Sequence, residues 1–148
     1  MIKPFEEYQK EGIVKRVKIN RERAKSLAVE SERKIRSLSK RIEKLGIYNE
    51  NANDYVEYCY DIIMHLARAK LSLDGYSAGG QGAHEAEVSY LRELGFSEND
   101  VQFADQLRYF RNGIMYYGKT LDKEYAEKVL EFLNKIYPKL KQLIKAIE

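Results

Sequence analysis

Apolar residues recur along most of this chain at steps of three and four, the spacing that places them on one face of an α-helix. Glycines at positions 46, 95 and 118 follow three of these stripes, where a left-handed residue commonly ends a helix. No stretch alternates with a period of two clearly enough to predict a sheet. The pattern predicts four long helices at about residues 20–45, 52–74, 97–117 and 120–147, and a short one at 83–94.

The first nineteen residues follow a different pattern. Pro4 is suited to the first turn of a short helix that Gly12 would end, and β-branched residues over 13–19 favour an extended or irregular segment. At 148 residues the chain is long enough for one ordinary domain. We therefore expect a short helix and an extended segment over 1–19, followed by a helical bundle over 20–148.

The connections between the predicted long helices are short, which favours antiparallel neighbours. The helix at 52–74 carries apolar residues on most of its sides and should lie at the centre. The predicted fold is all-α: an up-and-down antiparallel bundle of four main helices plus one short helix.

Composition narrows the class of protein and of site. The glycine-rich loop at 75–82 lacks the G-x-x-x-x-G-K-[ST] pattern of a phosphate-binding loop, so we expect no nucleotide cofactor there and no cofactor elsewhere. His65 and His84 have no second ligand at a spacing suited to zinc, so no metal is expected. Cys59 has no partner for a disulfide, and no window approaches about 18 apolar residues, so we expect a cytoplasmic protein and no membrane partner.

The charge is unevenly distributed. The net charge is only +3, but the segment from Lys10 to Lys44 holds thirteen Lys or Arg against five Glu, a net charge of +8. Such a segment suits a nucleic acid, an acidic protein partner or self-association of opposite faces, and it is equally compatible with a solvated helix face.

Most of the polar chemistry lies at 110–118. Arg111, Asn112 and Tyr116 place a cation, an amide and a phenol within about one and a half helical turns. They are either functional or a polar group that fixes this helix, for example by pairing with Asp105 or Glu85. Tyr109 is expected in the core or an interface. The apolar stripe assigned to packing is Phe103, Leu107, Phe110, Ile114 and Tyr117.

From Asn20 onward the chain resembles the HEPN family of helical domains. The resemblance is carried by residues 24–27, 65–71, 84–86 and 90–93 and by the stretch Leu107-Arg108-Tyr109-Phe110-Arg111-Asn112. It implies a helical bundle that dimerises so that two motifs face one RNA strand, often with a nucleotidyltransferase as antitoxin. Many members are metal-independent ribonucleases whose motif is Arg, four to six residues, then His.

Arg111 and Asn112 match that motif, but Tyr116 occupies the histidine position. A phenol with a pKa of about 10 is only ~0.1% ionised at pH 7 and is a poor base. We therefore predict a homodimer that binds RNA or a nucleotide without cleaving it, at a cleft lined by Arg108, Arg111, Asn112, Tyr116 and His84.

Two alternatives remain. In the first, the protein is an interaction partner of a nucleotidyltransferase in a toxin-antitoxin-like pair. In the second, it is a ribonuclease with a degenerate motif. In the second case Tyr116 or His84 replaces the missing histidine, since His84 begins a helix after the glycine-rich loop. His65 is flanked by apolar residues and is interpreted as a core residue.

Overall fold

The computed structural model describes residues 2–145, and these form the elements predicted from the apolar periodicity together with a small sheet. The predicted position of Ile147 in the last helix lies outside the described residues. In chain order the elements are α1 (Phe5–Lys10), β1 (Val14–Arg16), α2 (Arg21–Leu45), the 3₁₀ turn η1 (Asn49–Asn51), α3 (Ala52–Leu73), β2 (Tyr76–Ala78), α4 (Ala83–Glu93), α5 (Glu98–Tyr117) and α6 (Lys123–Lys145).

Side-chain caps and glycines set the ends of the long helices. The side chains of Asn20, Ser97 and Asp122 each accept a hydrogen bond from the backbone N–H three residues further on, at 2.9, 3.2 and 2.8 Å. At the other ends, Gly46 and Gly118 have φ angles of 73° and 64°, a region that glycine enters without strain. These boundaries agree with the sequence prediction.

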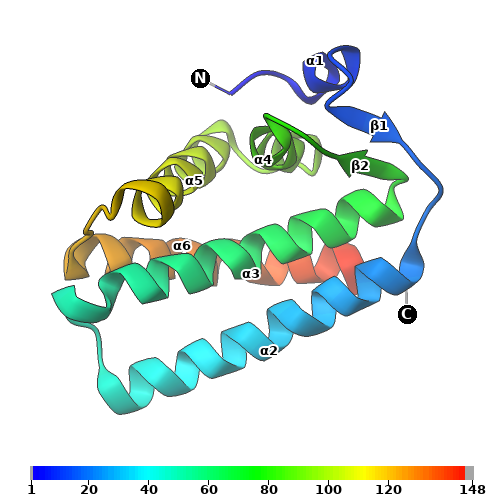
Figure 1. Ribbon diagram of the computed structural model, residues 1–148. Helices are drawn as coiled ribbons and strands as arrows, with labels where there is room; N and C mark the ends of the chain where they lie inside the picture. The colour runs from blue at the N-terminus through cyan, green and yellow to red at the C-terminus, as the bar shows by residue number, and fades with distance from the viewer. Residues whose placement is uncertain (1, 146–148) are drawn as a thin grey trace.

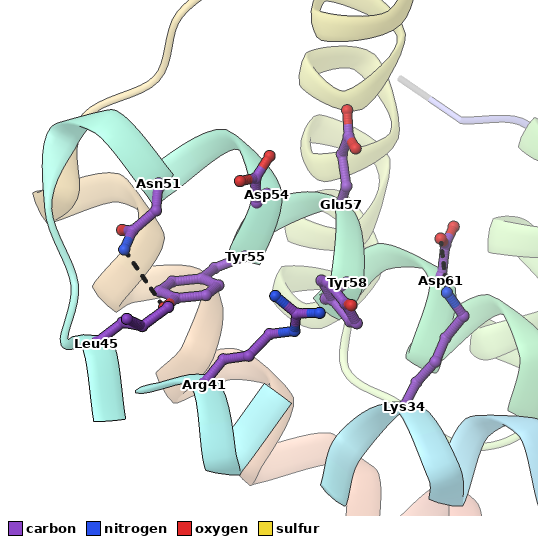
Figure 2. Close-up of a pocket in the computed structure, with 9 residues that line it drawn as sticks. All are labelled: Lys34, Arg41, Leu45, Asn51, Asp54, Tyr55, Glu57, Tyr58 and Asp61. Carbon is purple, nitrogen blue, oxygen red and sulfur yellow. Dashed lines mark hydrogen bonds and ion pairs between the residues drawn. The ribbon is translucent and has the colours of Figure 1, made fainter. Parts of the chain in front are cut away.

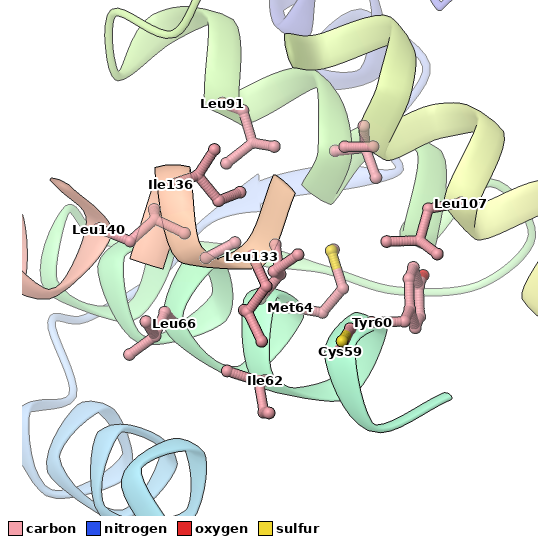
Figure 3. Close-up of a cluster of buried hydrophobic side chains, with 14 of the residues drawn as sticks. Cys59, Tyr60, Ile62, Met64, Leu66, Leu91, Leu107, Leu133, Ile136 and Leu140 are labelled. Carbon is pink, nitrogen blue, oxygen red and sulfur yellow. The ribbon is translucent and has the colours of Figure 1, made fainter. Parts of the chain in front are cut away.

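The four long helices alternate in direction along the chain, and α3 is the central one (Figure 1). α2 and α6 pack against α3, and α4 and α5 cover another side of it, whereas α2 hardly touches α6. The core between these helices is almost entirely apolar (Figure 3). Its fully buried members include Ile62, Leu66, Leu91, Leu107, Leu133 and Leu140. The predicted all-α class is thus confirmed for the described residues.

The structure also contains a two-stranded antiparallel sheet, which the sequence pattern did not predict. Its strand β1 precedes α2 in the chain, and its strand β2 follows α3. β1 pairs with β2 so that Val14 lies opposite Ala78 and Arg16 opposite Tyr76. The first part of the glycine-rich loop is therefore a strand. Phe5 in α1 is buried, and its ring centroid lies 4.6 Å from that of Tyr90 in α4, so the N-terminal segment shares the core of the bundle.

Candidate functional site

The residues singled out by the sequence lie on different sides of α5. At about 100° per residue, Tyr109 and Tyr116 point within about 20° of each other, and Asn112 lies about 40° from Tyr116. Arg111 lies about 140° from Tyr116, so the two side chains leave the helix in different directions. The motif therefore spreads across α5 from a cationic edge to an aromatic face.

Arg111 points toward α3. Its Nη2 lies 3.7 Å from Oδ1 of Asp61, and its guanidinium lies 5.4 Å from the centroid of the Tyr60 ring, within range of a cation–π interaction. Within residues 2–145, Nε of Arg111 is buried and has no hydrogen-bond partner. The Arg111 side chain is 22% exposed, and its guanidinium thus has N–H donors that are free to bind another group.

Arg108, one turn earlier, makes the contacts that the sequence suggested for Arg111. Its Nε donates to Oδ1 of Asp105 at 2.8 Å, and its Nη1 lies 4.0 Å from Oε1 of Glu85 in α4. The suggested pairing of Arg111 with Asp105 or Glu85 is therefore wrong. Asp105 lies three residues before Arg108 on the helix and pairs with it, whereas Arg111 reaches α3.

Tyr60 of α3 contacts Arg111 and is influenced by the charges of the neighbouring arginines. Burial raises the pKa of its phenol to about 12, while the charges of Arg68, Arg111 and Arg108 partly oppose that rise. Glu87 acts in the same direction as burial. Three arginines from α3 and α5 thus converge on one buried aromatic side chain.

Arg68, Glu87 and His84 form a second polar group next to Tyr60. Nε of Arg68 donates to Oε2 of Glu87 at 2.7 Å, and the Glu87 side chain is only 7% exposed. Nδ1 of His84 lies 3.1 Å from Nη2 of Arg68 and 3.2 Å from Oε1 of Glu87. In the tautomer with an unprotonated Nδ1, this nitrogen accepts from Arg68. Within residues 2–145, Oε1 of Glu87 is buried and forms no hydrogen bond, although His84 lies beside it with half of its side chain exposed.

The other side of the motif is open to solvent. Tyr109, Met115, Tyr116 and Tyr117 are 65%, 51%, 72% and 87% exposed, which is unusual for large apolar side chains at the end of one helix. Tyr109 and Tyr117 were predicted to lie in the core or in an interface, and their exposure excludes the core for both. Asn112 lies between the exposed tyrosines and the arginines and is half-buried.

The predicted cleft is an open face of α5. The pocket shown in Figure 2 holds about 300 Å³ and lies beside Arg111, because Asp61 lines it, but neither Arg111 nor Tyr116 does. In this pocket Nζ of Lys34 lies 5.2 Å and the guanidinium of Arg41 lies 5.5 Å from the ring of Tyr58. The carboxylates of Asp54, Glu57 and Asp61 offset this positive charge.

The polar residues of α3 and α4 that hold the arginines were not predicted from the sequence. Asp61 and Arg68 lie seven residues apart on one side of α3, and Glu87 occupies a buried position within the short helix α4. A charged residue inside an otherwise apolar stripe is a usable signal, because it must find a partner when it is buried. The identity of the partner depends on how α3, α4 and α5 pack.

Two further findings concern the described residues. Between residues 2 and 145, no helix is both long and apolar enough to cross a lipid bilayer. In the same part of the chain, no three His, Cys, Asp or Glu side chains are placed to hold a metal ion. No protein-family model matches the chain, and the comparisons with curated proteins and with solved structures give no match either.

Proposed function

We propose that this protein is a HEPN-like RNA-binding domain that holds single-stranded RNA across α5 without cleaving it. One observation carries the proposal: within residues 2–145 Arg111 keeps a buried donor without a partner at one edge of α5, and a separate face of the same helix exposes Tyr109 and Tyr116. The resemblance of residues 107–112 to the family motif points to the same helix.

The arginine edge supplies the contacts that a phosphate requires. Arg108 and Arg111 lie three residues apart and therefore side by side on α5, and each already faces a carboxylate. A guanidinium carries five donors, and the 3.7 Å separation between Arg111 and Asp61 leaves most of those of Arg111 without a short hydrogen bond. A phosphate oxygen can take these donors without displacing a tight ion pair.

The aromatic face supplies the contacts that bases require. Tyr109 and Tyr116 are seven residues apart, about two turns or 10 Å along the helix, and both are largely exposed. Unpaired bases stack on exposed aromatic rings, and alanine substitution of such a ring costs about 1–3 kcal/mol per base. Asn112 lies between the two ring positions and the arginines, where an amide can hydrogen-bond a base edge or a ribose hydroxyl.

Binding without cleavage is proposed because Tyr116 lacks the surroundings of a general base. Within residues 2–145, no side chain forms a hydrogen bond to the phenol of Tyr116, which extends into solvent. A base needs a partner that accepts its proton or stabilises its charged form. His84 has such a partner in Glu87, but it contacts Arg68 of α3 and not Arg111.

We also propose that two copies bring their α5 faces together around one RNA strand. The apolar area of Met115 and Tyr117, 51% and 87% exposed, is available for such an interface beside the bases. Sedimentation of the protein with and without RNA tests this part. A monomer in both conditions contradicts it without affecting RNA binding by a single chain.

The RNA-binding proposal is tested with a fluorescein-labelled single-stranded oligouridylate and fluorescence anisotropy. Tyr116→Ala should weaken binding by about 5- to 150-fold, the equivalent of about 1–3 kcal/mol for a lost stacking contact. Arg111→Gln should weaken it by about tenfold or more, because a charge-assisted contact to phosphate is lost. Both side chains are at least partly exposed, so neither variant should lose its helical circular dichroism.

The matched control is Tyr48→Ala, which removes a tyrosine that is 61% exposed in the turn between α2 and α3. It should leave RNA affinity within about twofold of the wild type. Equal affinity for RNA in the wild type and both α5 variants would sink the proposal. Cleavage of the oligonucleotide that disappears in His84→Ala would instead support the degenerate ribonuclease.

A further inference from the structure

An apolar groove lies between α2 and α6, on a face of the molecule that the proposed RNA site does not use. It holds about 480 Å³. Its floor consists of Leu66 of α3 and Ile144 of α6, and Ala28 and Val29 of α2 are the apolar part of one wall. Leu66 is fully buried and Ile144 is 7% exposed, whereas Val29 is 56% exposed. The floor is thus recessed, and one wall presents a bare apolar side chain.

The groove exists because α2 has a neighbour on only one side. α2 packs along α3 but hardly touches α6, and one ion pair, Lys141 Nζ to Glu32 Oε2 at 3.0 Å, connects the two helices. A helix in a bundle usually buries a stripe against two neighbours. Among residues 2–145, no second helix packs closely along the part of α2 that precedes Glu32.

The open surface continues past the start of α2. A shallower depression of about 520 Å³, lined by residues 18–22, shares Arg21 and Glu22 with the groove. Ile19 in this depression is 50% exposed, and Val17 just before it is 46% exposed. Three exposed β-branched residues, Val17, Ile19 and Val29, thus mark a strip that begins in the segment before α2 and extends into the first half of α2.

The rim of this strip is positively charged. Five cationic side chains line the two depressions against two carboxylates, Glu22 and Glu32, and Glu32 already pairs with Lys141. Within residues 2–145, Lys18, Arg21 and Lys25 form no ion pair. The five cations are Lys18, Arg21, Lys25, Lys141 and Lys145. Three of the thirteen cationic residues noted in the segment from residue 10 to residue 44 therefore line the two depressions.

Shape and chemistry select the occupant. The groove contains no aromatic ring on which a base could stack, and a flat bilayer cannot reach a recessed floor. The α2 wall runs from Arg21 to Glu32, about 17 Å at 1.5 Å per residue, which matches about three turns of a helix. A helix in a groove inserts apolar residues spaced i, i+3, i+4 and i+7, and its flanks face the rim.

We infer that this groove binds an amphipathic helix of a protein partner whose flanks carry Asp or Glu. The apolar stripe of that helix covers Ala28 and Val29, and its carboxylates pair with the rim cations on both walls. With the partner helix in the groove, α2, α3 and α6 become part of a four-helix arrangement. This interaction is independent of the proposed RNA site on α5.

The test uses a fluorescein-labelled stapled helix with leucines at the spacing above and glutamates on both flanks, and fluorescence anisotropy with the full chain. Val29→Glu should weaken binding by about tenfold or more, because it places a carboxylate against the apolar stripe. Lys25→Glu should weaken it by several-fold and reduce its salt dependence. Hydrogen exchange should slow at residues 21–32 and 141–145 when the peptide is bound.

The matched control is Leu45→Glu, which alters another exposed apolar residue of α2, 57% exposed but outside the groove. It should leave peptide affinity within about twofold. The inference is overturned if the stapled helix does not bind, if a scrambled peptide of the same composition binds equally, or if Leu45→Glu weakens binding as much as Val29→Glu. Binding of anionic vesicles that Val29→Glu abolishes, in the absence of peptide binding, would assign the groove to a membrane surface instead.

Discussion

Replacing Arg68 with Met should destabilise the protein far more than removing any surface cation. Arg68 joins α3 to α4 by donating from Nε to Oε2 of Glu87 at 2.7 Å. Burial lowers the pKa of Arg68, but the hydrogen bond and charge of Glu87 outweigh burial and leave it raised. The substitution keeps the apolar stem and removes the charge, so a carboxylate that is only 7% exposed loses its partner.

The magnitude follows from the burial of the two side chains. Removing one partner of a buried ion pair costs about 3–5 kcal/mol, because the remaining charge is left uncompensated. The Arg68 side chain is 21% exposed, and His84 lies 3.2 Å from the other oxygen of Glu87, so water and the imidazole reduce this cost. We expect a loss of about 2–4 kcal/mol in the free energy of unfolding. A loss of 3 kcal/mol lowers the melting temperature by about 6–12 °C in a chain of this size.

The assay is urea unfolding followed by circular dichroism, arranged as a double-mutant cycle. Glu87→Gln alone should also destabilise the protein, since Arg68 then loses its carboxylate. The two losses should not add, and a coupling energy of about 1–3 kcal/mol is expected for residues in one ion pair. The control is Arg36→Met, which removes an exposed pair with Glu32 at 3.2 Å and should cost no more than about 0.5 kcal/mol. A loss in Arg68→Met no larger than in Arg36→Met would refute the argument.

Two further predictions concern other parts of the chain. Cys59 is fully buried, and burial raises its pKa to about 12, so its reaction with a thiol reagent near neutral pH should proceed only at the rate of unfolding; rapid labelling of the native protein would contradict this. The hydrogen bonds from Arg92 and Gln102 lower the pKa of Glu98 from 4.5 to about 2, so this carboxylate stabilises the fold above about pH 4.5 and loses that effect as the pH falls toward 2. Glu98→Gln should therefore show a smaller loss of urea resistance between about pH 5 and about pH 3 than the wild type, and parallel losses would exclude this contribution.

The helices could be predicted from the sequence because their signals are local. Asn20, Ser97 and Gly118 act on the turn in which they lie, and apolar periodicity depends only on spacing along one helix. The small sheet could not be predicted in the same way. Val14 pairs with Ala78 across sixty-four positions of sequence, and strands of three residues are too short to show an alternating pattern.

The end of α5 shows where periodicity fails. Tyr117 continues the stripe of Leu107 and Ile114, so the sequence pattern assigned it to packing. Periodicity identifies the side of a helix that a residue occupies, but burial also requires a neighbouring element at that level. Leu107 is 1% exposed and Tyr117 is 87% exposed, so the packing around α5 ends between them.

The polar site was predicted only in part for a related reason. Arg108 and Arg111 were identified from the motif, but Asp61, Arg68 and Glu87 come from other helices and meet them only after α3, α4 and α5 pack. Electrostatic partners separated by tens of residues leave no spacing signal in one sequence. The motif therefore indicated where the cations are, and the fold determined which carboxylates hold them.

The two proposed surfaces can be separated experimentally because they use different helices. Val29 lies in α2 and Tyr116 in α5, both largely exposed, so neither substitution should alter the core that the surfaces share. Val29→Glu should weaken peptide binding and retain RNA binding, and Tyr116→Ala should do the reverse, because substitutions at distant sites act independently. If each variant instead weakened both ligands, the two surfaces would be coupled through α3, which packs against both α2 and α5.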